Sequence, residues 1–265
     1  MRVHVPVHGS RPDPQLPYVR QLIQLALQHA GRTAELVDVP TEMSQTRSLA
    51  EVAQGTAPND IMWTMTDRFR ESCGLLPVRV PIDRGLLGWR VLLVRRSDLA
   101  LWEPVRSLAA LRQHRAGQGH DWPDTTILRA NGLPVATGSH YEALFRMLGS
   151  GRFDYFPRSV LEIDAELAVP GREQLAVVPR LALHYPAATY FFVAPTRPDL
   201  AEALSTGLGA AARDGSFQQL HDAYYGPIWR EHLPPGTTVL TLNNPTLSFQ
   251  TPLNQRAFWI EPPRS

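Results

Sequence analysis

The sequence contains no lysine, a single cysteine and no long apolar run. All 26 basic residues are arginine. Walker-type phosphate binding, Schiff-base catalysis and the kinase active site each need a primary amine, so the absence of lysine excludes these three mechanisms. A lone cysteine, Cys73, excludes an internal disulfide bond and a thiolate metal site. No stretch of about 18 apolar residues occurs, and we therefore expect no membrane-spanning helix and no membrane insertion.

The composition predicts a globular chain that lacks the broad positively charged surface needed to bind a polyanion. Of its 265 residues, 43% are hydrophobic and 19% are charged, which is enough apolar material for a core. The 26 basic and 25 acidic residues leave a net charge of +1, so we expect no nucleic-acid partner. The N-terminal residues 1–6 contain no apolar signal core. This is compatible with a cytosolic protein or with the mature form of a secreted one.

Short apolar runs alternate with helical periodicity along most of the chain, which predicts an α/β fold. Helices are expected at 19–30, 44–54 and 217–225, and the chain beyond Pro234 is expected to be irregular. Two stretches, roughly 1–92 and 98–187, each contain enough strands and helices for a small sheet of their own. The segment after about 190 is too short to fold alone, and it must return to one of these lobes. If this segment returns to the first lobe, the chain crosses between the lobes twice, near 93–97 and 186–190. Two such crossings form a hinge.

Two groups of polar residues follow predicted strands. Trp63-Thr64-Met65-Thr66 ends a strand expected at 60–65, and it mixes an indole, hydroxyls and a thioether suited to a small amphipathic ligand. Trp63 and Met65 equally fit a core. Arg70 follows this strand, and Arg158 follows a strand expected at 153–156. Open α/β sheets bind ligands at the carboxyl ends of strands, where a guanidinium clamps a carboxylate; the alternative for each arginine is a surface ion pair.

A third candidate is the glycine-containing segment Gly117-Gln118-Gly119-His120-Asp121-Trp122, which precedes a predicted helix. Unpaired N–H groups at a helix N-terminus favour an anion. Trp122 stands where the dinucleotide fingerprint needs a third glycine, so NAD binding is not expected. The alternatives are a small-ligand site and a simple capping turn.

Neither metal nor catalytic machinery is evident. The nine histidines include no i, i+4 pair with a glutamate between, and Gly-x-Ser-x-Gly is absent. We expect no metal, no cofactor and no enzymatic activity. Cys73 is expected to be a packing residue.

The order of several segments resembles the type 2 periplasmic solute-binding proteins, specifically the family 3, amino-acid-binding group of ABC importers. The resemblance covers roughly residues 1–230 and rests on five segments, which are 60–70, 81–91, 107–119, 151–154 and 211–217. It implies a two-lobed α/β fold in which each lobe is a small sheet flanked by helices. Lobe 1 is expected at 1–94 and 189–265, and lobe 2 at 95–188. The lobes are expected to close over one small solute.

The resemblance also implies ligand contacts, partners and a location. Expected contacts are Tyr18, Thr64, Thr66 and Arg70 in lobe 1 and Gly119, His120 and Asp121 in lobe 2, with Arg70 on the solute's carboxylate. Trp63, Met65, Trp122 and Arg158 complete the predicted site from the analysis of strand ends and turns. An ABC permease or a membrane receptor is the expected partner. The protein is expected to be a periplasmic monomer in its mature form, with no signal peptide in this sequence.

Two departures from the family pattern leave alternatives open. The usual Thr-x-x-Arg is one residue longer here, so Arg68 competes with Arg70. Arg158 and Ser159 stand where amino-acid binders carry an aspartate for the α-amino group, which favours a more anionic solute. The alternative functions are a ligand-sensing module without a transporter and a dehydratase-like lyase, for which His120 and Asp121 are the adjacent acid–base pair.

Overall fold

The chain forms two compact units, each built from segments far apart in the sequence. The computed structural model describes residues 1–8, 13–43 and 45–260. The first unit contains Met1–Gly85, Ala188–Pro227 and Leu247–Ile260, and the second contains Leu86–Ala187 and Ile228–Thr246. The chain therefore passes between the units after Gly85, Ala187, Pro227 and Thr246. These boundaries differ from the expected 1–94, 95–188 and 189–265, because 86–94 and 228–246 lie in the second unit.

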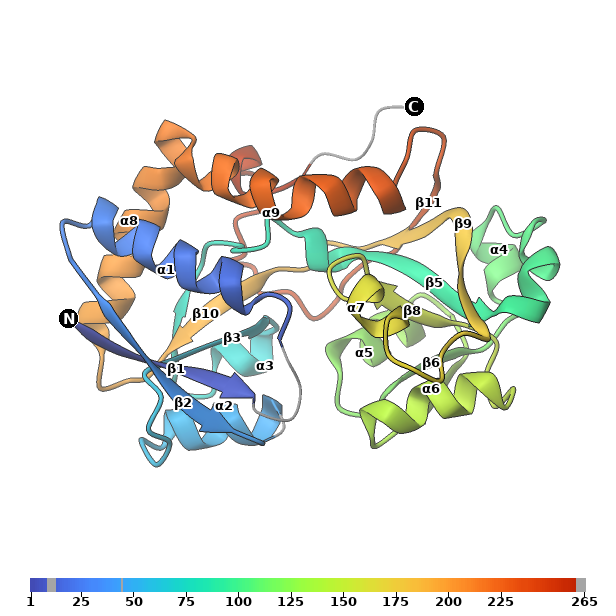
Figure 1. Cartoon of the computed structure of the whole chain (residues 1–265), viewed down its shortest axis with the longest axis horizontal. Helices are drawn as coiled ribbons and strands as arrows, with labels where there is room; N and C mark the ends of the chain where they lie inside the picture. Colours follow the sequence, from blue (N-terminus) through green and yellow to red (C-terminus); the bar gives the residue numbers. More distant parts are fainter. Residues whose placement is uncertain (9–12, 44, 261–265) are drawn as a thin grey trace. The chain divides into compact units, whose positions relative to one another are not determined.

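The first unit combines two small sheets with five helices, which Figure 1 labels along the chain. Its elements are β1 (Arg2–His8), α1 (Leu16–His29), β2 (Glu35–Thr41), α2 (Gln45–Ala53), β3 (Ile61–Met65), α3 (Arg68–Glu71), β4 (Leu76–Val78), β10 (Thr189–Val193), α8 (Pro198–Asp214), α9 (Ser216–His232) and the 3₁₀ turn η3 (Arg256–Phe258). The last residues of α9 belong to the second unit. Ser44, the expected first residue of the second helix, lies outside the described residues.

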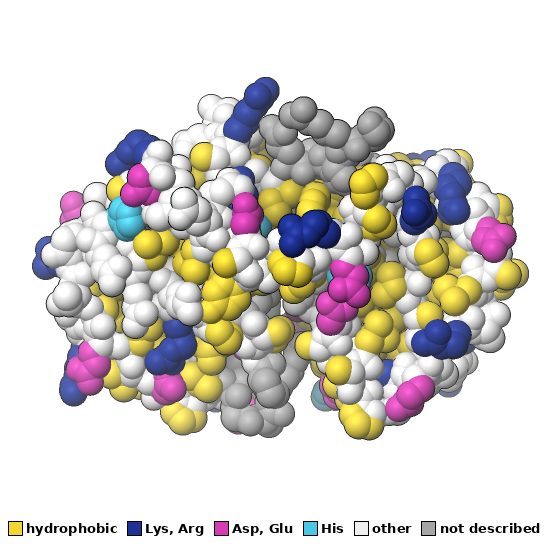
Figure 2. All heavy atoms as spheres, turned by 45° about the horizontal axis from the view of Figure 1, so that its top comes forward, with side chains coloured by type: hydrophobic (Ala, Val, Ile, Leu, Met, Phe, Trp, Pro, Cys, Tyr) yellow, Lys and Arg dark blue, Asp and Glu magenta, His cyan; other side chains and the backbone are white. Residues whose placement is uncertain are grey.

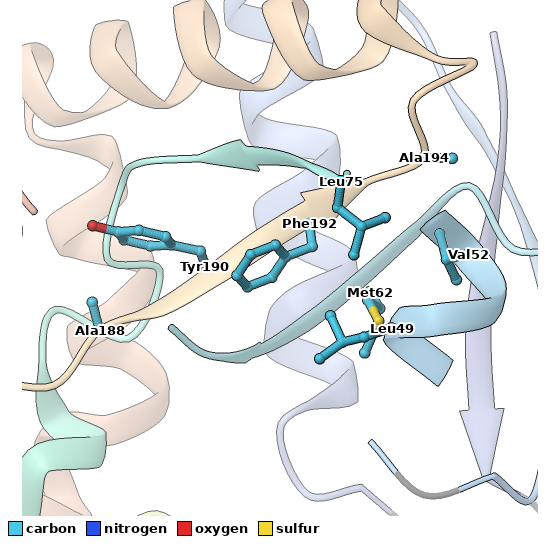
Figure 3. Packing of buried hydrophobic residues seen from close by; sticks show 8 residues of the cluster. All are labelled: Leu49, Val52, Met62, Leu75, Ala188, Tyr190, Phe192 and Ala194. Carbon is cyan, nitrogen blue, oxygen red and sulfur yellow. The ribbon is translucent and has the colours of Figure 1, made fainter. Parts of the chain in front are cut away.

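The sheets of the first unit join early and late parts of the chain. Strands β1 and β2 pair in parallel, and β10 lies antiparallel between β3 and β4. The segment 188–227 therefore belongs to the first unit. Figure 3 shows the apolar cluster around β10, formed by side chains of α2, β3 and β10 with neighbouring residues. Its members are Leu49, Val52, Met62, Leu75, Ala188, Tyr190, Phe192 and Ala194.

Helices α1 and α8 lie side by side in the first unit (Figure 1). Apolar residues of α1 at helical spacing, including Leu22 and Ala26, are fully buried. Gly207 of α8 sits against the α1 backbone, where an added Cβ would lie 1.7 Å from the carbonyl oxygen of Ala26. A residue without a Cβ is therefore required at this helix crossing. Gly215 ends α8 at φ +85°, in the left-handed region that favours glycine.

The second unit is organised around a four-stranded sheet in the order β11-β9-β5-β8. Its elements are η1 (Leu86–Gly88), β5 (Trp89–Arg95), η2 (Arg96–Trp102), α4 (Leu108–Leu111), β6 (Ala116–Gly119), α5 (Pro123–Ala130), β7 (Val135–Gly138), α6 (Tyr141–Gly149), β8 (Phe156–Ser159), α7 (Ile163–Leu167), β9 (Leu175–His184) and β11 (Thr238–Thr241). Strands β6 and β7 pair in parallel, and an isolated bridge joins Ala116 to Tyr155 just before β8.

Three elements differ from the sequence prediction. Gly117–Gly119 belongs to strand β6, whereas a turn was expected there, because pairing with β7 supplies the order that glycine does not favour. Residues after Pro234 were expected to be irregular, but 238–241 form β11 beside β9. Helix α9 continues past Gly226-Pro227 to His232, beyond its expected end at Tyr225. Trp229 of this last turn packs edge-on against Trp89, with ring centroids 4.9 Å apart.

Candidate functional site

The first-unit candidate site begins where β3 ends. Asp67 caps the short helix α3 by accepting a hydrogen bond from the backbone N–H of Arg70. This cap turns the chain so that the Arg70 side chain reaches back along β3. The Nη1 atom of Arg70 donates to the Thr64 hydroxyl at 2.7 Å and to the Met65 carbonyl at 2.8 Å. Arg70 is only 5% exposed, and it is held in one orientation by the strand that precedes it.

Neighbouring polar side chains extend this arrangement. The Thr64 hydroxyl donates to Oε1 of Gln45 at 3.1 Å, and Nη2 of Arg70 approaches the same oxygen at 3.5 Å. Thr66 is fully buried, and its hydroxyl donates to Glu71 at 2.8 Å. Arg79 completes this second pair, with Nη2 3.0 Å from Glu71. The structure therefore brings Thr64 and Arg70 together, whereas Thr66 is engaged with Glu71.

Two of the predicted first-unit residues are core residues. Met65 is 5% exposed, and Tyr18 is 1% exposed. Tyr18 donates its hydroxyl to the carbonyl of Ile82 and packs edge-on against Tyr225 at 4.8 Å. Burial raises the pKa of Tyr18 well above its ordinary value, with smaller contributions from nearby charges. Tyr18 thus holds α1 to the segment that contains Ile82, whereas it was expected at the mouth of a site.

Trp63 and Arg68 remain accessible beside this site. Trp63 is half-buried, and its indole N–H donates to Asp13 at 3.1 Å. Arg68 is exposed at the start of α3. Of the two competing arginines, Arg70 is the one fixed against β3.

The second-unit candidate turn follows β6. Gly119 ends the strand, and an added Cβ there would lie 2.5 Å from the Trp122 indole. The missing side chain therefore lets the indole lie against the strand end. Thr125 fastens the turn from α5 by donating its hydroxyl to the Gly119 carbonyl at 2.6 Å. His120 and Asp121 are both exposed at the tip, and their nearest side-chain atoms are 3.9 Å apart.

The first turn of α5 carries a buried carboxylate. Asp124 lies in this turn, is 6% exposed and pairs with Nη2 of Arg90 at 2.7 Å. Tyr185 donates to the same carboxylate and accepts from Nε of Arg90 at 2.9 Å. Burial lowers the pKa of Arg90, but the charges of Asp124, Tyr185 and Glu162 together outweigh this effect, and the net direction is upward. The Asp124 carboxylate is thus engaged by Arg90 and Tyr185, and anion binding at the helix terminus stays a prediction.

Arg158 lies in a second closed cluster. Its guanidinium donates to Glu166 at 2.6–3.0 Å and to Glu162 at 2.9 Å. It also lies over the rings of Trp122 at 5.1 Å and Phe156 at 4.8 Å. Arg158 is 2% exposed, and this burial opposes the charged form of its guanidinium. The two glutamates nevertheless keep the pKa of Arg158 well above its usual range. The structure thus gives Arg158 a packing role that the strand-end prediction did not include.

Sequence reasoning missed the buried polar residues of the second unit. Gln118 of β6 is fully buried, and neither atom of its side-chain amide has a hydrogen-bond partner in the described part of the chain. The Arg90–Asp124–Tyr185 triad joins β5, α5 and the end of β9 through residues far apart in sequence. The only signal for Gln118 was its place between two glycines. Nothing in the local sequence signalled the triad.

The two described hollows do not coincide with the predicted residues. One, of about 410 Å³, is lined by Arg95, Arg96, Ser97, Gly149 and Gln174. The other, of about 230 Å³, is lined by residues of 113–115, Pro134 and residues of 151–154. Both lie in the second unit. The candidate site therefore rests on the groups at the ends of β3 and β6.

Comparisons with known proteins relate the chain to binding proteins by structure alone. No family model and no curated protein matches the sequence. The probable amino-acid ABC transporter extracellular-binding protein ytmK of Bacillus subtilis matches with a TM-score of 0.60 at 14% identity, over 85% of this chain and 98% of that one. An ancestral arginine-binding protein bound to arginine matches with a TM-score of 0.57 at 14% identity, over 85% and 98%. The Bordetella pertussis BvgS periplasmic VFT2 domain matches with a TM-score of 0.57 at 17% identity, over 84% of this chain and 93% of that one.

These matches span both units and confirm the predicted α/β fold of periplasmic binding proteins. At such identities they establish the fold and not the ligand. Within residues 1–8, 13–43 and 45–260, every helix falls short of the length or the hydropathy that a bilayer requires.

Proposed function

We propose that the protein is an extracytoplasmic solute-binding protein that captures a small, carboxylate-bearing, amino-acid-like solute for an ABC importer. Support comes from a fold shared with proteins whose names state amino-acid or arginine binding. In this proposal the chain performs no chemistry on the solute, acts as a monomer and passes the solute to a membrane permease.

The observation that carries the proposal is the setting of Arg70. A guanidinium is planar and offers paired N–H groups that match the two oxygens of a carboxylate. Arg70 is oriented by Thr64 and the Met65 carbonyl at the carboxyl end of β3. The charge is thus held before a solute arrives, and little side-chain entropy is lost on binding.

The proposed second-unit contacts are at the tip of the turn after β6. His120 and Asp121 are exposed there, and Trp122 presents an indole braced by Phe156 in near-parallel stacking at 6.3 Å. An imidazole and a carboxylate suit the polar end of an amino-acid-like solute. Closure of the two lobes on binding, as the sequence resemblance implies, belongs to the proposal. A ligand-dependent fall in the radius of gyration, measured by small-angle X-ray scattering, tests it.

The alternative is a sensing module with the same fold. It is favoured by the match to the BvgS periplasmic domain and by a match to the ligand-binding core of GluR0 from Nostoc punctiforme, bound to L-glutamate, with a TM-score of 0.53 at 15% identity. Genes for a permease and an ATPase beside this gene would support transport. A neighbouring receptor gene would support sensing. A lyase is less favoured, because His120 and Asp121 are both open to water.

A ligand screen tests the binding function directly. The chain is first unfolded and refolded to remove co-purified solute, and its thermal midpoint is then recorded with amino acids, dicarboxylates and other small anions. A solute at 100 times its Kd stabilises the folded state by about 2.7 kcal/mol, which is a clear shift for a protein of this size. Calorimetry then gives the Kd. The absence of a shift with every compound would contradict solute binding.

A further inference from the structure

Three side chains of the second unit bring metal-binding atoms together. Asp164, Glu231 and His232 each offer one ligand atom, and these atoms all lie within 4.8 Å of one another. Asp164 stands in the first turn of α7, whereas Glu231 and His232 end α9. The sequence predicted no metal site because it lacks metal-ligand spacing along one helix. Here the group is assembled from two helices distant in sequence.

The histidine is held in place and the carboxylates are open. Nε2 of His232 lies 2.8 Å from Oδ1 of Asp164. The His232 side chain is 10% exposed, and that of Asp164 is 52% exposed. Glu231 is also exposed. The imidazole is thus oriented by the protein, while the carboxylates face solvent and leave room for water ligands.

The local charge favours a cation. Two carboxylates meet at the C-terminus of α9, where unpaired backbone carbonyls give the helix end a partial negative charge. Imidazole nitrogen is a ligand for zinc and neighbouring transition metals, whereas calcium and magnesium take oxygen ligands. The ligand set therefore selects a first-row divalent ion.

We propose that Asp164, Glu231 and His232 form a zinc-binding site with one imidazole and two carboxylate ligands, completed by water. The ion takes the lone pair of Nε2 of His232 in place of the hydrogen bond to Oδ1 of Asp164, and the single proton of the neutral imidazole then lies on Nδ1. The bound ion fastens the last turn of α9 to α7 within the second unit. This site is independent of the solute proposed above.

Calorimetric titration of the chelator-treated full chain with Zn²⁺ tests the site. One ion is expected per chain. We expect His232→Ala to weaken Zn²⁺ binding at least about 10-fold, and Glu231→Gln to weaken it severalfold. Ca²⁺ is expected to give no heat at the same concentrations.

The matched control is His29→Ala. His29 forms a comparable pair with Asp214, at 2.7 Å, but among the described residues this pair does not belong to a three-ligand group. The His29→Ala substitution should therefore leave the affinity for Zn²⁺ unchanged. Zinc affinity equal to wild type in both His232→Ala and Glu231→Gln, or no uptake by wild type, overturns the proposal. If the circular dichroism spectrum shows that His232→Ala does not fold, the Zn²⁺ affinities of the variants Glu231→Gln and Asp164→Asn, at exposed positions, test the proposal instead.

Discussion

The guanidinium of Arg70 reaches back to the hydroxyl of Thr64, 2.7 Å away, within the span of one short capped turn. The two residues belong to consecutive elements, β3 and α3, and the Asp67 cap fixes the angle between them. The relationship therefore depends on local sequence alone. This makes the first-unit site separable from the second unit in mutational tests.

Replacing Arg70 tests the solute site. For whichever carboxylate ligand the screen identifies, Arg70→Gln should weaken binding about 10- to 100-fold, because a charge-assisted hydrogen bond contributes about 1.5–3 kcal/mol. Calorimetry at constant pH and salt gives the Kd. The control is Arg68→Gln, two residues away and exposed, which should bind as wild type does. A loss confined to Arg68→Gln would transfer the carboxylate role to Arg68.

A buried histidine and a half-buried one predict a fall in stability on mild acidification. Burial lowers the pKa of His221 in the first unit to about 4, against smaller opposing effects led by its hydrogen bond to Asp222. Burial likewise lowers the pKa of His184 in the second unit to about 4. Between about pH 6.5 and 4 the unfolded chain binds protons that the folded chain refuses, so stability is lost as pH falls through this window.

The expected loss is about 1–3 kcal/mol for each histidine. Urea unfolding at pH 7.5, 5.5 and 4.5 measures it. His221→Gln and His184→Gln should each flatten the dependence, and the exposed His120→Gln should not. Equal stability at the three pH values would show that these imidazoles protonate in the folded state.

The helix crossing of the first unit predicts opposite effects for two glycines of α8. Gly207→Ala places a Cβ against the Ala26 carbonyl, so we expect a loss of about 2–4 kcal/mol as α1 and α8 are forced apart. For Gly209 the nearest atom to an added Cβ is Nη1 of Arg213, at 3.5 Å. Gly209→Ala should therefore gain up to about 1 kcal/mol from helix propensity. Denaturant unfolding of the two variants compares them, and equal effects would mean that the crossing is not tight.

The Arg158 cluster predicts a large cost for removing one carboxylate. Glu166→Ala leaves a 2% exposed guanidinium with reduced compensation, and the expected loss is about 3–5 kcal/mol. Glu173→Ala, on an exposed side chain nearby in sequence, should change stability by less than about 0.5 kcal/mol. A small effect at Glu166 together with impaired solute binding would restore Arg158 as a ligand contact.

On the face shown in Figure 2, arginines (dark blue) are interspersed with aspartates and glutamates (magenta), and the sequence as a whole has a net charge of +1.

Periodicity predicted most helices and strands because their apolar spacing is local. Helix α1 and strand β3 lie where the spacing placed them. Strand β6 was missed because Ala116-Gly117-Gln118-Gly119 has no strand propensity, and its order comes from β7. Strand β11 contains the strand-favouring residues Thr and Val, but it is short, it lies in a Pro- and Asn-rich stretch, and its partner β9 is distant in sequence.

The contacts of the candidate site were predictable only where they are local. The sequence predicts Arg70 and Thr64 as parts of one site, and the two side chains meet because the strand and the turn that carry them are adjacent. The sequence analysis predicted ligand roles for Arg158 and Tyr18. Their partners in the structure, Glu166 and the Ile82 carbonyl, reach them through tertiary packing, which the local sequence does not reveal. The Asp164–His232 pair was invisible for the same reason. Spacing along a chain does not reveal groups that meet through folding.

The repeated passage of the chain between the units has a practical consequence for dissecting the molecule. Because it crosses after Gly85, Ala187, Pro227 and Thr246, neither unit is a continuous stretch that can be expressed by trimming the ends. A protease that cuts at any one crossing leaves the other covalent links intact. The two halves should therefore migrate together after a single nick unless the folded state itself is lost.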